Sequence, residues 1–185
     1  MIFNKHSDLE GLHAFLSASK YHWVNYTPEQ LRASYSNYRA TEKGTELHAF
    51  AKECIRLGVK LQASKKTLNQ YVNDAIGFKM RPEQILYYSP NCFGTADAIC
   101  FRRKTLRIHD LKTGSTRVSM KQLLIYAGLF CLEYKVDPED ITTVLRIYQN
   151  DEFTEYIPEP EEVRFYMRRI IESDEIITKI ILEGA

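Results

Sequence analysis

The sequence predicts an α+β fold in which helices flank a mixed β-sheet, within a single domain of 185 residues. Helical apolar patterns fill most of residues 1–80, strand patterns dominate 81–158, and a helical pattern returns over 159–185. One strongly amphipathic segment, 118–134, separates two pairs of expected strands, as a helix between the strands of a sheet would. We therefore expect a helical N-terminal part, a sheet core that contains one helix, and a C-terminal helix.

The expected helices have recognisable ends. Residues 28–39 predict the first helix, because Thr27 suits a cap and Pro28 suits a first turn. A second helix is expected over about 42–57, closed by Gly58. Its apolar stripe would be Leu47, Phe50, Ala51, Cys54 and Ile55. Further helices are expected over 65–76, 118–134 and 161–182.

Five segments predict strands. Residues 85–89, 93–101 and 106–111 are short, apolar or alternating, and bounded by turn residues. Residues 141–148 and 153–157 predict a second hairpin that turns at 149–152. With the helix at 118–134, these strands complete the expected sheet core.

Composition excludes several classes of protein. No apolar run approaches the roughly 20 residues that span a bilayer, and charges interrupt the N-terminal segment where a signal peptide would be apolar. The four cysteines are scattered without a Cys-x-x-Cys pair, which argues against a zinc knuckle and favours free thiols in a reducing cytoplasm. We expect a cytoplasmic protein with no membrane partner.

The net charge of +1 conceals two opposite segments. Residues 98–125 hold seven basic residues and one acid, whereas residues 133–162 hold ten acids and two basic residues. The basic segment could meet phosphates, although a solvated hairpin tip would have the same composition.

The stretch 93–111 predicts a hairpin that brings two acids together. If it turns between Arg103 and Lys104, Asp97 lies directly opposite Asp110. Like charges paired in this way are destabilising, and such carboxylates commonly share a proton or bind a cation. Lys112 lies two residues beyond Asp110 and so projects to the same side. A shifted register would separate the two acids.

Two carboxylates followed by a nearby lysine suit metal-assisted phosphodiester hydrolysis. The carboxylates can bind a hard divalent cation, and the lysine can orient or deprotonate water or stabilise developing negative charge. The pattern acid, acid-x-lysine resembles the PD-(D/E)XK nuclease superfamily, here with Asp97 and Asp110-Leu111-Lys112.

Within that superfamily the chain resembles the RecB-like branch, which includes phage exonucleases. Residues about 41–150 contain its Gly-x-x-x-His, Gly-x-x-Asp, Asp-x-Lys-Thr-Gly and Gln-x-x-x-Tyr patterns in the same order. The matching positions are Gly44 with His48, Gly94 with Asp97, Asp110 to Gly114, and Gln122 with Tyr126. The resemblance implies a restriction-endonuclease-like core.

The resemblance also implies roles for individual residues. His48 and the Leu111 backbone carbonyl would join Asp97 and Asp110 as ligands of Mg²⁺ or Mn²⁺. Gln122 and Tyr126 would position Lys112 and the scissile phosphate. We expect the backbone of DNA to be guided by Arg102, Arg103, Lys104, Arg117 and Lys121. His109 should point away from Asp110 and bind no metal.

Some expectations concern partners and cofactors. Certain relatives hold an iron–sulfur cluster with four cysteines, three near the C-terminus; no cysteine follows Cys131 here, so we expect no cluster. The resemblance implies an exonuclease of phage-type DNA recombination, replication or repair. It would act on single-stranded DNA or duplex ends, as a homo-oligomer or with recombination or replication proteins.

Two other functions fit the same residues. One is a catalytically silent module that binds nucleic acid or protein on the same fold. The other is an interaction protein that works through its acidic segment, for example as an inhibitor that mimics DNA. Without the other motifs, His48 or the pair of Gln122 and Tyr126 would be interpreted as residues with a purely structural role.

Overall fold

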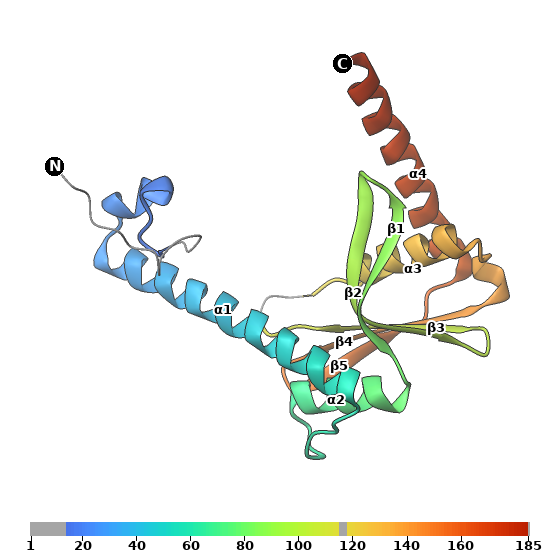
Figure 1. Ribbon diagram of the computed structural model, residues 1–185, viewed down its shortest axis with the longest axis horizontal. Helices are drawn as coiled ribbons and strands as arrows, with labels where there is room; N and C mark the ends of the chain where they lie inside the picture. The colour runs from blue at the N-terminus through green and yellow to red at the C-terminus, as the bar shows by residue number, and fades with distance from the viewer. Residues whose placement is uncertain (1–13, 115–117, 185) are drawn as a thin grey trace, which may run out of the picture. The chain divides into compact units, whose positions relative to one another are not determined.

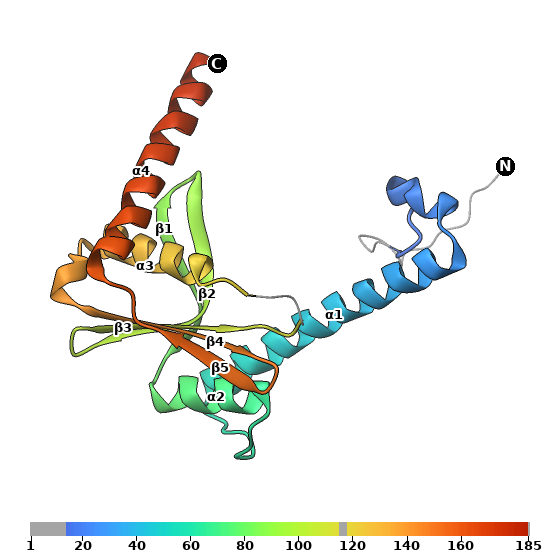
Figure 2. The same cartoon turned by 180° about the vertical axis from the view of Figure 1, so that it is seen from behind.

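The computed structural model describes residues 14–114 and 118–184 (Figures 1 and 2). It divides into two compact units, Met1–Thr45 and Glu46–Ala185, which we describe separately. The helix α1 (Pro28–Leu57) contains the boundary between them. None of the helices in the described ranges is both long and apolar enough to cross a membrane.

In the described part of the first unit, a 3₁₀ segment precedes the start of α1. The segment η2 (Ala18–Asn25) begins after Ser17, whose hydroxyl accepts a hydrogen bond from the Ser19 N–H. At the start of α1, Gln30 N–H donates to Thr27 Oγ1 and Thr27 N–H donates to Gln30 Oε1, so a reciprocal capping box closes this helix end.

The two helices expected over 28–39 and 42–57 are one continuous helix of 30 residues, so that prediction was wrong. Between them Ala40 and Thr41 contain no proline and no turn signal, and the Thr41 hydroxyl donates to the Asn37 carbonyl within the helix. The end at Gly58 is confirmed: its φ is +69°, and the Val59 N–H donates to the Cys54 carbonyl.

The second unit contains a five-stranded mixed sheet in the order β1-β2-β3-β4-β5. Its strands are β1 (Arg81–Ser89), β2 (Cys92–Arg102), β3 (Thr105–Leu111), β4 (Thr142–Gln149) and β5 (Glu152–Tyr156). Neighbours are antiparallel except β3 and β4, which are parallel. Parallel neighbours need a long connection, and the helix α3 (Lys121–Tyr134) supplies it.

Helices cover both faces of the sheet, which confirms the predicted α+β class. One face packs on α3 and α4 (Pro160–Glu183), through Ile108, Leu123 and Val163 among others. The opposite face packs on α2 (Thr67–Gly77) and the end of α1, through Val72, Ala98 and Leu111 among others. Figure 1 shows α3 and α2 on opposite sides of the strands, and a short η3 (Pro138–Asp140) precedes β4.

The β2–β3 register is the predicted one. Ala98 pairs with His109 and Arg102 pairs with Thr105, so the turn lies at Arg103 and Lys104. Both turn residues have positive φ, 48° and 60°, as a tight hairpin turn requires. The paired register ends at Ala98–His109, and the next residues along the two strands are Asp97 and Asp110.

The alternation of side chains along β2 breaks at Asp97. Ala96 and Ile99 both belong to the core on the α3 side, although residues three apart on a regular strand face opposite ways. The β1–β2 hairpin bends away from the other strands in Figure 1. Irregularities of this kind occur beside active sites, where they redirect a side chain.

The remaining elements differ from the prediction mainly at their ends. β1 starts at Arg81 rather than residue 85, and α3 starts at Lys121 rather than residue 118. Phe50 is 49% exposed, so it does not belong to the buried stripe of α1 that contains Ala51, Cys54 and Ile55.

Candidate metal and catalytic site

Asp97 and Asp110 lie on neighbouring strands at one end of the β2–β3 ladder. Asp97 Oδ2 accepts a hydrogen bond from the Leu111 N–H at 2.9 Å, which ties the side chain of one strand to the backbone of the other. Asp110 is the more enclosed, with its side chain 3% exposed against 18% for Asp97. The fold thus holds two carboxyl groups on neighbouring strands, both largely shielded from solvent.

The enclosure perturbs the protonation of Asp97. Burial raises its pKa from 3.8 to about 6, and the Asp110 carboxylate adds to the rise. The Leu111 N–H, His48 and Lys112 act in the opposite direction but do not cancel it. A nearby cation would stabilise the ionised form of Asp97.

The Asp110 carboxylate is in contact with Lys112. Nζ lies 2.9 Å from Oδ2, and Oδ2 has no well-directed hydrogen bond among the described residues. A carboxylate oxygen has two lone pairs, so Oδ2 could contact a divalent cation as well as the ammonium. The residue type and its position beside Asp97 therefore fit a cation site.

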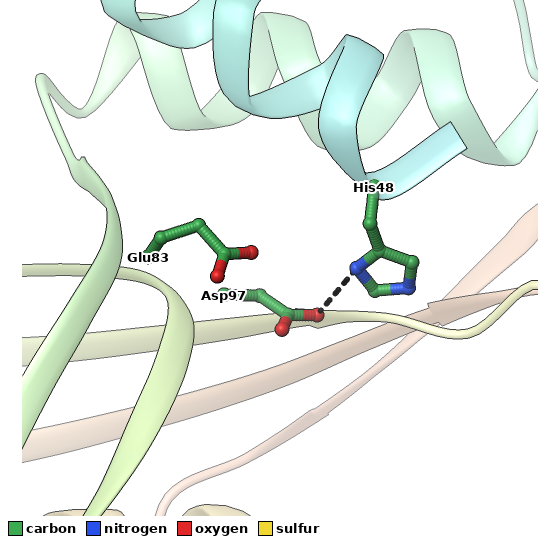
Figure 3. A group of neighbouring side chains, drawn as sticks. All are labelled: His48, Glu83 and Asp97. Atoms are coloured by element: carbon green, nitrogen blue, oxygen red, sulfur yellow. Dashed lines mark ion pairs between the residues drawn. The ribbon is translucent and has the colours of Figure 1, made fainter. Parts of the chain in front are cut away.

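His48 and Glu83 complete a cluster around Asp97 (Figure 3). One ligand atom from each of the three residues lies within 4.8 Å of the others. His48 projects from α1 with its Nδ1 3.5 Å from Asp97 Oδ2, while Glu83 comes from β1. The structure therefore brings His48 to Asp97 and adds a carboxylate, Glu83, that the sequence analysis missed, whereas Asp110 on the neighbouring strand is not part of this cluster.

Glu83 could have been predicted from the pairing of β1 with β2. β1 and β2 pair Pro82 with Ala98 and Gln84 with Ala96, so Glu83 faces Asp97 across the ladder. The expected strand began at residue 85, which left Glu83 out. Its φ of +51° is unusual for a residue with a side chain and marks a local irregularity of the kind that clusters at functional sites.

Lys112 is connected to α3 by a chain of hydrogen bonds. Its Nζ donates to Asp110 Oδ1 and to Gln122 Oε1, both at 3.0 Å. Gln122 Nε2 in turn donates to the Tyr126 hydroxyl at 3.2 Å. The predicted group of Lys112, Gln122 and Tyr126 is therefore brought together, with the ammonium held by acceptors on both sides.

Gly94 makes room for this chain. A Cβ at Gly94 would lie 2.9 Å from Tyr126 Cε1, closer than side-chain atoms approach. The bare backbone at Gly94 lets the Tyr126 ring lie against β2, which explains why the Gly-x-x-Asp pattern needs a glycine here.

The Leu111 carbonyl is directed toward the same place. In a strand, the N–H and C=O of one residue point to the same neighbouring strand. Because the Leu111 N–H meets Asp97, its carbonyl lies on the Asp97 side too. The Leu111 side chain is buried in the core between the sheet and α2, so only its backbone can contribute to the site.

The basic residues predicted to contact DNA lie in two different places. Arg102, Arg103 and Lys104 are exposed at the β2–β3 turn, at the other end of the ladder from the two acids. Lys121 is exposed at the first position of α3, next to Gln122. Arg117 falls outside the described residues.

His109 points away from the acids, as predicted. It is fully buried on the α2 side, with its Nδ1 3.3 Å from the Tyr148 hydroxyl and its ring against Phe78. Burial lowers its pKa to about 3, and Arg146 and Arg107 contribute to this shift. His109 is therefore a neutral core residue.

The chemical types of these ligands suit a divalent cation such as Mg²⁺ or Mn²⁺. Carboxylate and carbonyl oxygens suit Mg²⁺ and Mn²⁺, and one imidazole favours Mn²⁺ over Mg²⁺. Asp97, Asp110, His48 and the Leu111 carbonyl remain the predicted ligands, with Glu83 as an additional oxygen donor. A lysine lies within reach of the same carboxylates, which is the arrangement that hydrolysis of a phosphodiester would use.

Comparison with known proteins adds one family. The model of a family described as "Protein of unknown function (DUF2800)" matches residues 83–149. The matched stretch runs from Glu83 through the acids, Lys112, Gln122 and Tyr126, whereas His48 precedes it. None of the curated proteins matches the chain.

Proposed function

We propose that the protein is a divalent-metal-dependent deoxyribonuclease of the PD-(D/E)XK superfamily, RecB-like branch. The observation that carries the proposal is the cluster of His48, Glu83 and Asp97, whose ligand atoms lie within 4.8 Å of one another, beside the ion pair of Asp110 with Lys112. The two aspartates, the histidine and the lysine were expected from the sequence, and Glu83 is an addition from the structure.

The residues would divide the work of hydrolysis. Asp97, Asp110, His48 and the Leu111 carbonyl would hold Mg²⁺ or Mn²⁺, which when bound polarises a phosphate oxygen and lowers the pKa of a bound water. Lys112 is 33% exposed on its side chain, so its ammonium can reach a phosphate that approaches from solvent. It would orient the attacking water or stabilise the charge on the phosphate.

Gln122 and Tyr126 would act as positioning residues. The Gln122 side-chain oxygen accepts a hydrogen bond from Lys112 Nζ in addition to Asp110, and the Tyr126 hydroxyl accepts one from the Gln122 amide. A lysine fixed by two acceptors loses little conformational entropy when the reaction begins.

The biological setting extends the proposal by resemblance. The protein would be a cytoplasmic exonuclease of phage-type DNA recombination, replication or repair, acting on single-stranded DNA or duplex ends. It would work as a homo-oligomer or beside recombination or replication proteins.

The close contact between Lys112 and Asp110 also fits a second function. Nζ lies 2.9 Å and 3.0 Å from the two carboxylate oxygens, an ion pair that would neutralise the site in a catalytically silent module. Cleavage would separate the two functions, because only the nuclease turns over.

The test is cleavage of end-labelled single- and double-stranded DNA with Mg²⁺, with Mn²⁺ and with EDTA. We expect cleavage only with a metal, and loss of cleavage in Lys112→Met. Lys179→Met is the matched control, because Lys179 is exposed on α4 and has no ion pair among the described residues. Absence of metal-dependent cleavage in the wild type would refute the proposal.

A further inference from the structure

Two adjoining cavities lie at the end of the sheet where β2 turns into β3. Their volumes are about 300 and 350 Å³, and both are lined by Lys79, Cys100 and Arg102. The first cavity also has Arg81 in its wall, and the second has Arg103 and Arg107. We call the two together the basic groove, defined by these five cationic residues.

The charge of the basic groove is unbalanced. Among the residues that the structure describes, no acidic side chain lines either cavity and none of the five cations has an ion pair. Elsewhere in the second unit, by contrast, Arg146 and Arg164 each contact at least two carboxylates. Five like charges around two adjoining cavities repel one another, and an anionic ligand would relieve that repulsion.

Aromatic rings line the groove beside the cations. The rings of Phe101 and Phe130 lie 5.2 Å apart between centroids, and those of Phe130 and Tyr134 lie 4.9 Å apart. Phe101 is 43% exposed and Tyr134 is 52% exposed, so two of the three rings present surface to solvent. All three line the same cavity as Arg81 and Arg102.

The combination of these features indicates the ligand. A phosphate or an acidic peptide would need only the cations. A single strand of nucleic acid offers both phosphates for the cations and unpaired bases for exposed rings to stack on. Arg107 is already held over the Phe78 ring, with its Cζ 4.5 Å from the centroid, so its guanidinium is fixed in place.

Most of the basic groove is displaced from the metal site along the strands. Arg107 precedes Asp110 by three residues, and Arg102 follows Asp97 by five, which corresponds to about 10 and 16 Å along the strands. Arg81 lies nearer, two residues from Glu83 on β1, so the groove extends from the β2–β3 turn toward the metal site.

We propose that the basic groove binds single-stranded nucleic acid, with its cations on the phosphates and with Phe101 and Tyr134 stacking on bases. The proposal rests on the proposed function only in identifying that strand as the nuclease substrate. The proposed nucleic-acid contacts thus include the turn residues Arg102 and Arg103 and, in addition, Lys79, Arg81, Arg107 and Tyr134.

The test is fluorescence anisotropy of a labelled oligothymidylate in EDTA, where binding is measured without cleavage. The double variant Lys79→Glu/Arg102→Glu should bind at least tenfold more weakly. The slope of log K against log salt should fall by about 0.7 for each phosphate that the variant no longer neutralises. The control Lys60→Glu/Lys179→Glu has the same net charge at exposed sites outside the groove and should bind like wild type.

A third variant tests the aromatic part. Tyr134→Ala should weaken binding at least fivefold with an unchanged salt slope, which a loss of charge would not produce. Equal binding by the groove variant and its control would overturn the proposal. So would wild-type binding by Tyr134→Ala, or polyglutamate that binds as tightly as the oligonucleotide, since the groove would then fit an acidic protein.

The two proposals can fail separately. Binding in EDTA that depends on the groove, without metal-dependent cleavage, would refute the nuclease and leave the groove. Metal-dependent cleavage by a protein whose groove variant binds like its control would refute the groove and leave the nuclease.

Discussion

Asp97→Asn should stabilise the metal-free protein, because the wild type holds an ionised Asp97 at an energetic cost. The pKa of Asp97 is about 6 in the folded protein, against an ordinary value of 3.8. A carboxyl whose folded pKa is raised binds its proton more tightly when folded, so its penalty is absent below about pH 3.8. The penalty grows as pH rises from there to about 6 and is constant above.

The magnitude follows from the two pKa values. Linkage gives a penalty of about 1 kcal/mol at pH 4.5 and about 3 kcal/mol at pH 7.5. Asparagine carries no charge, and its side-chain carbonyl can still accept the hydrogen bond from the Leu111 N–H. Asp97→Asn should therefore raise the free energy of unfolding in EDTA at pH 7.5 by up to about 3 kcal/mol, which is about 6–12 °C in Tm for a chain of this size.

The assay is urea unfolding followed by far-UV circular dichroism at pH 4.5 and 7.5. Fluorescence would be a poor probe, since the single tryptophan, Trp23, lies in the first unit. Asp140→Asn, at an exposed position, is the matched control for loss of one charge. Mn²⁺ at ten times its Kd should stabilise the wild type by about 1.4 kcal/mol and leave Asp97→Asn unaffected.

The result that would refute this reasoning is an Asp97→Asn protein less stable than wild type in EDTA at pH 7.5. An advantage that does not change between pH 4.5 and 7.5 would also refute it, because the titration of Asp97 would then not be the cause.

Three further substitutions test the parts of the site. His48→Ala should reduce cleavage with Mn²⁺ more than with Mg²⁺, because imidazole favours transition metals; equal losses in a metal titration would remove His48 from the ligands. Lys112→Met should lose at least 100-fold in cleavage while calorimetry and gel shifts show normal binding of Mn²⁺ and DNA, and near-normal turnover would make the acid-x-lysine match accidental. Gly94→Ala should displace Tyr126 and lower kcat by about ten- to 100-fold with unchanged Mn²⁺ affinity, whereas wild-type kcat would show that the Tyr126 contact with Gln122 is not needed.

The sequence was sufficient for features that depend on local rules. The β2–β3 turn was placed between Arg103 and Lys104 from the pattern of the two strands, and that register predicted that Asp97 and Asp110 would be neighbours beyond the pair Ala98–His109. Gln122 and Tyr126 are one helical turn apart, so their contact also follows from local geometry.

Features that depend on packing between distant segments were missed. Glu83 joins the site only because β1 extends four residues further than its apolar pattern, as far as Arg81. Lys79 and Arg81 lie at or before the start of that strand and meet Arg102 only once the sheet has formed, so no local pattern marks the basic groove. The continuity of α1 was not predicted, although Ala40 is a strong helix former and Thr41 is not a helix breaker.

The central claim is that Asp97 and Asp110 hold one divalent cation, and Mn²⁺ binding measured by isothermal titration calorimetry tests it most directly. Asp110→Asn should weaken Mn²⁺ binding at least tenfold, or about 1.4 kcal/mol, because it removes a charged ligand from a buried position. Asp140→Asn should bind Mn²⁺ like the wild type. Equal Mn²⁺ affinity in Asp110→Asn and the wild type, or no binding to either, would contradict the account.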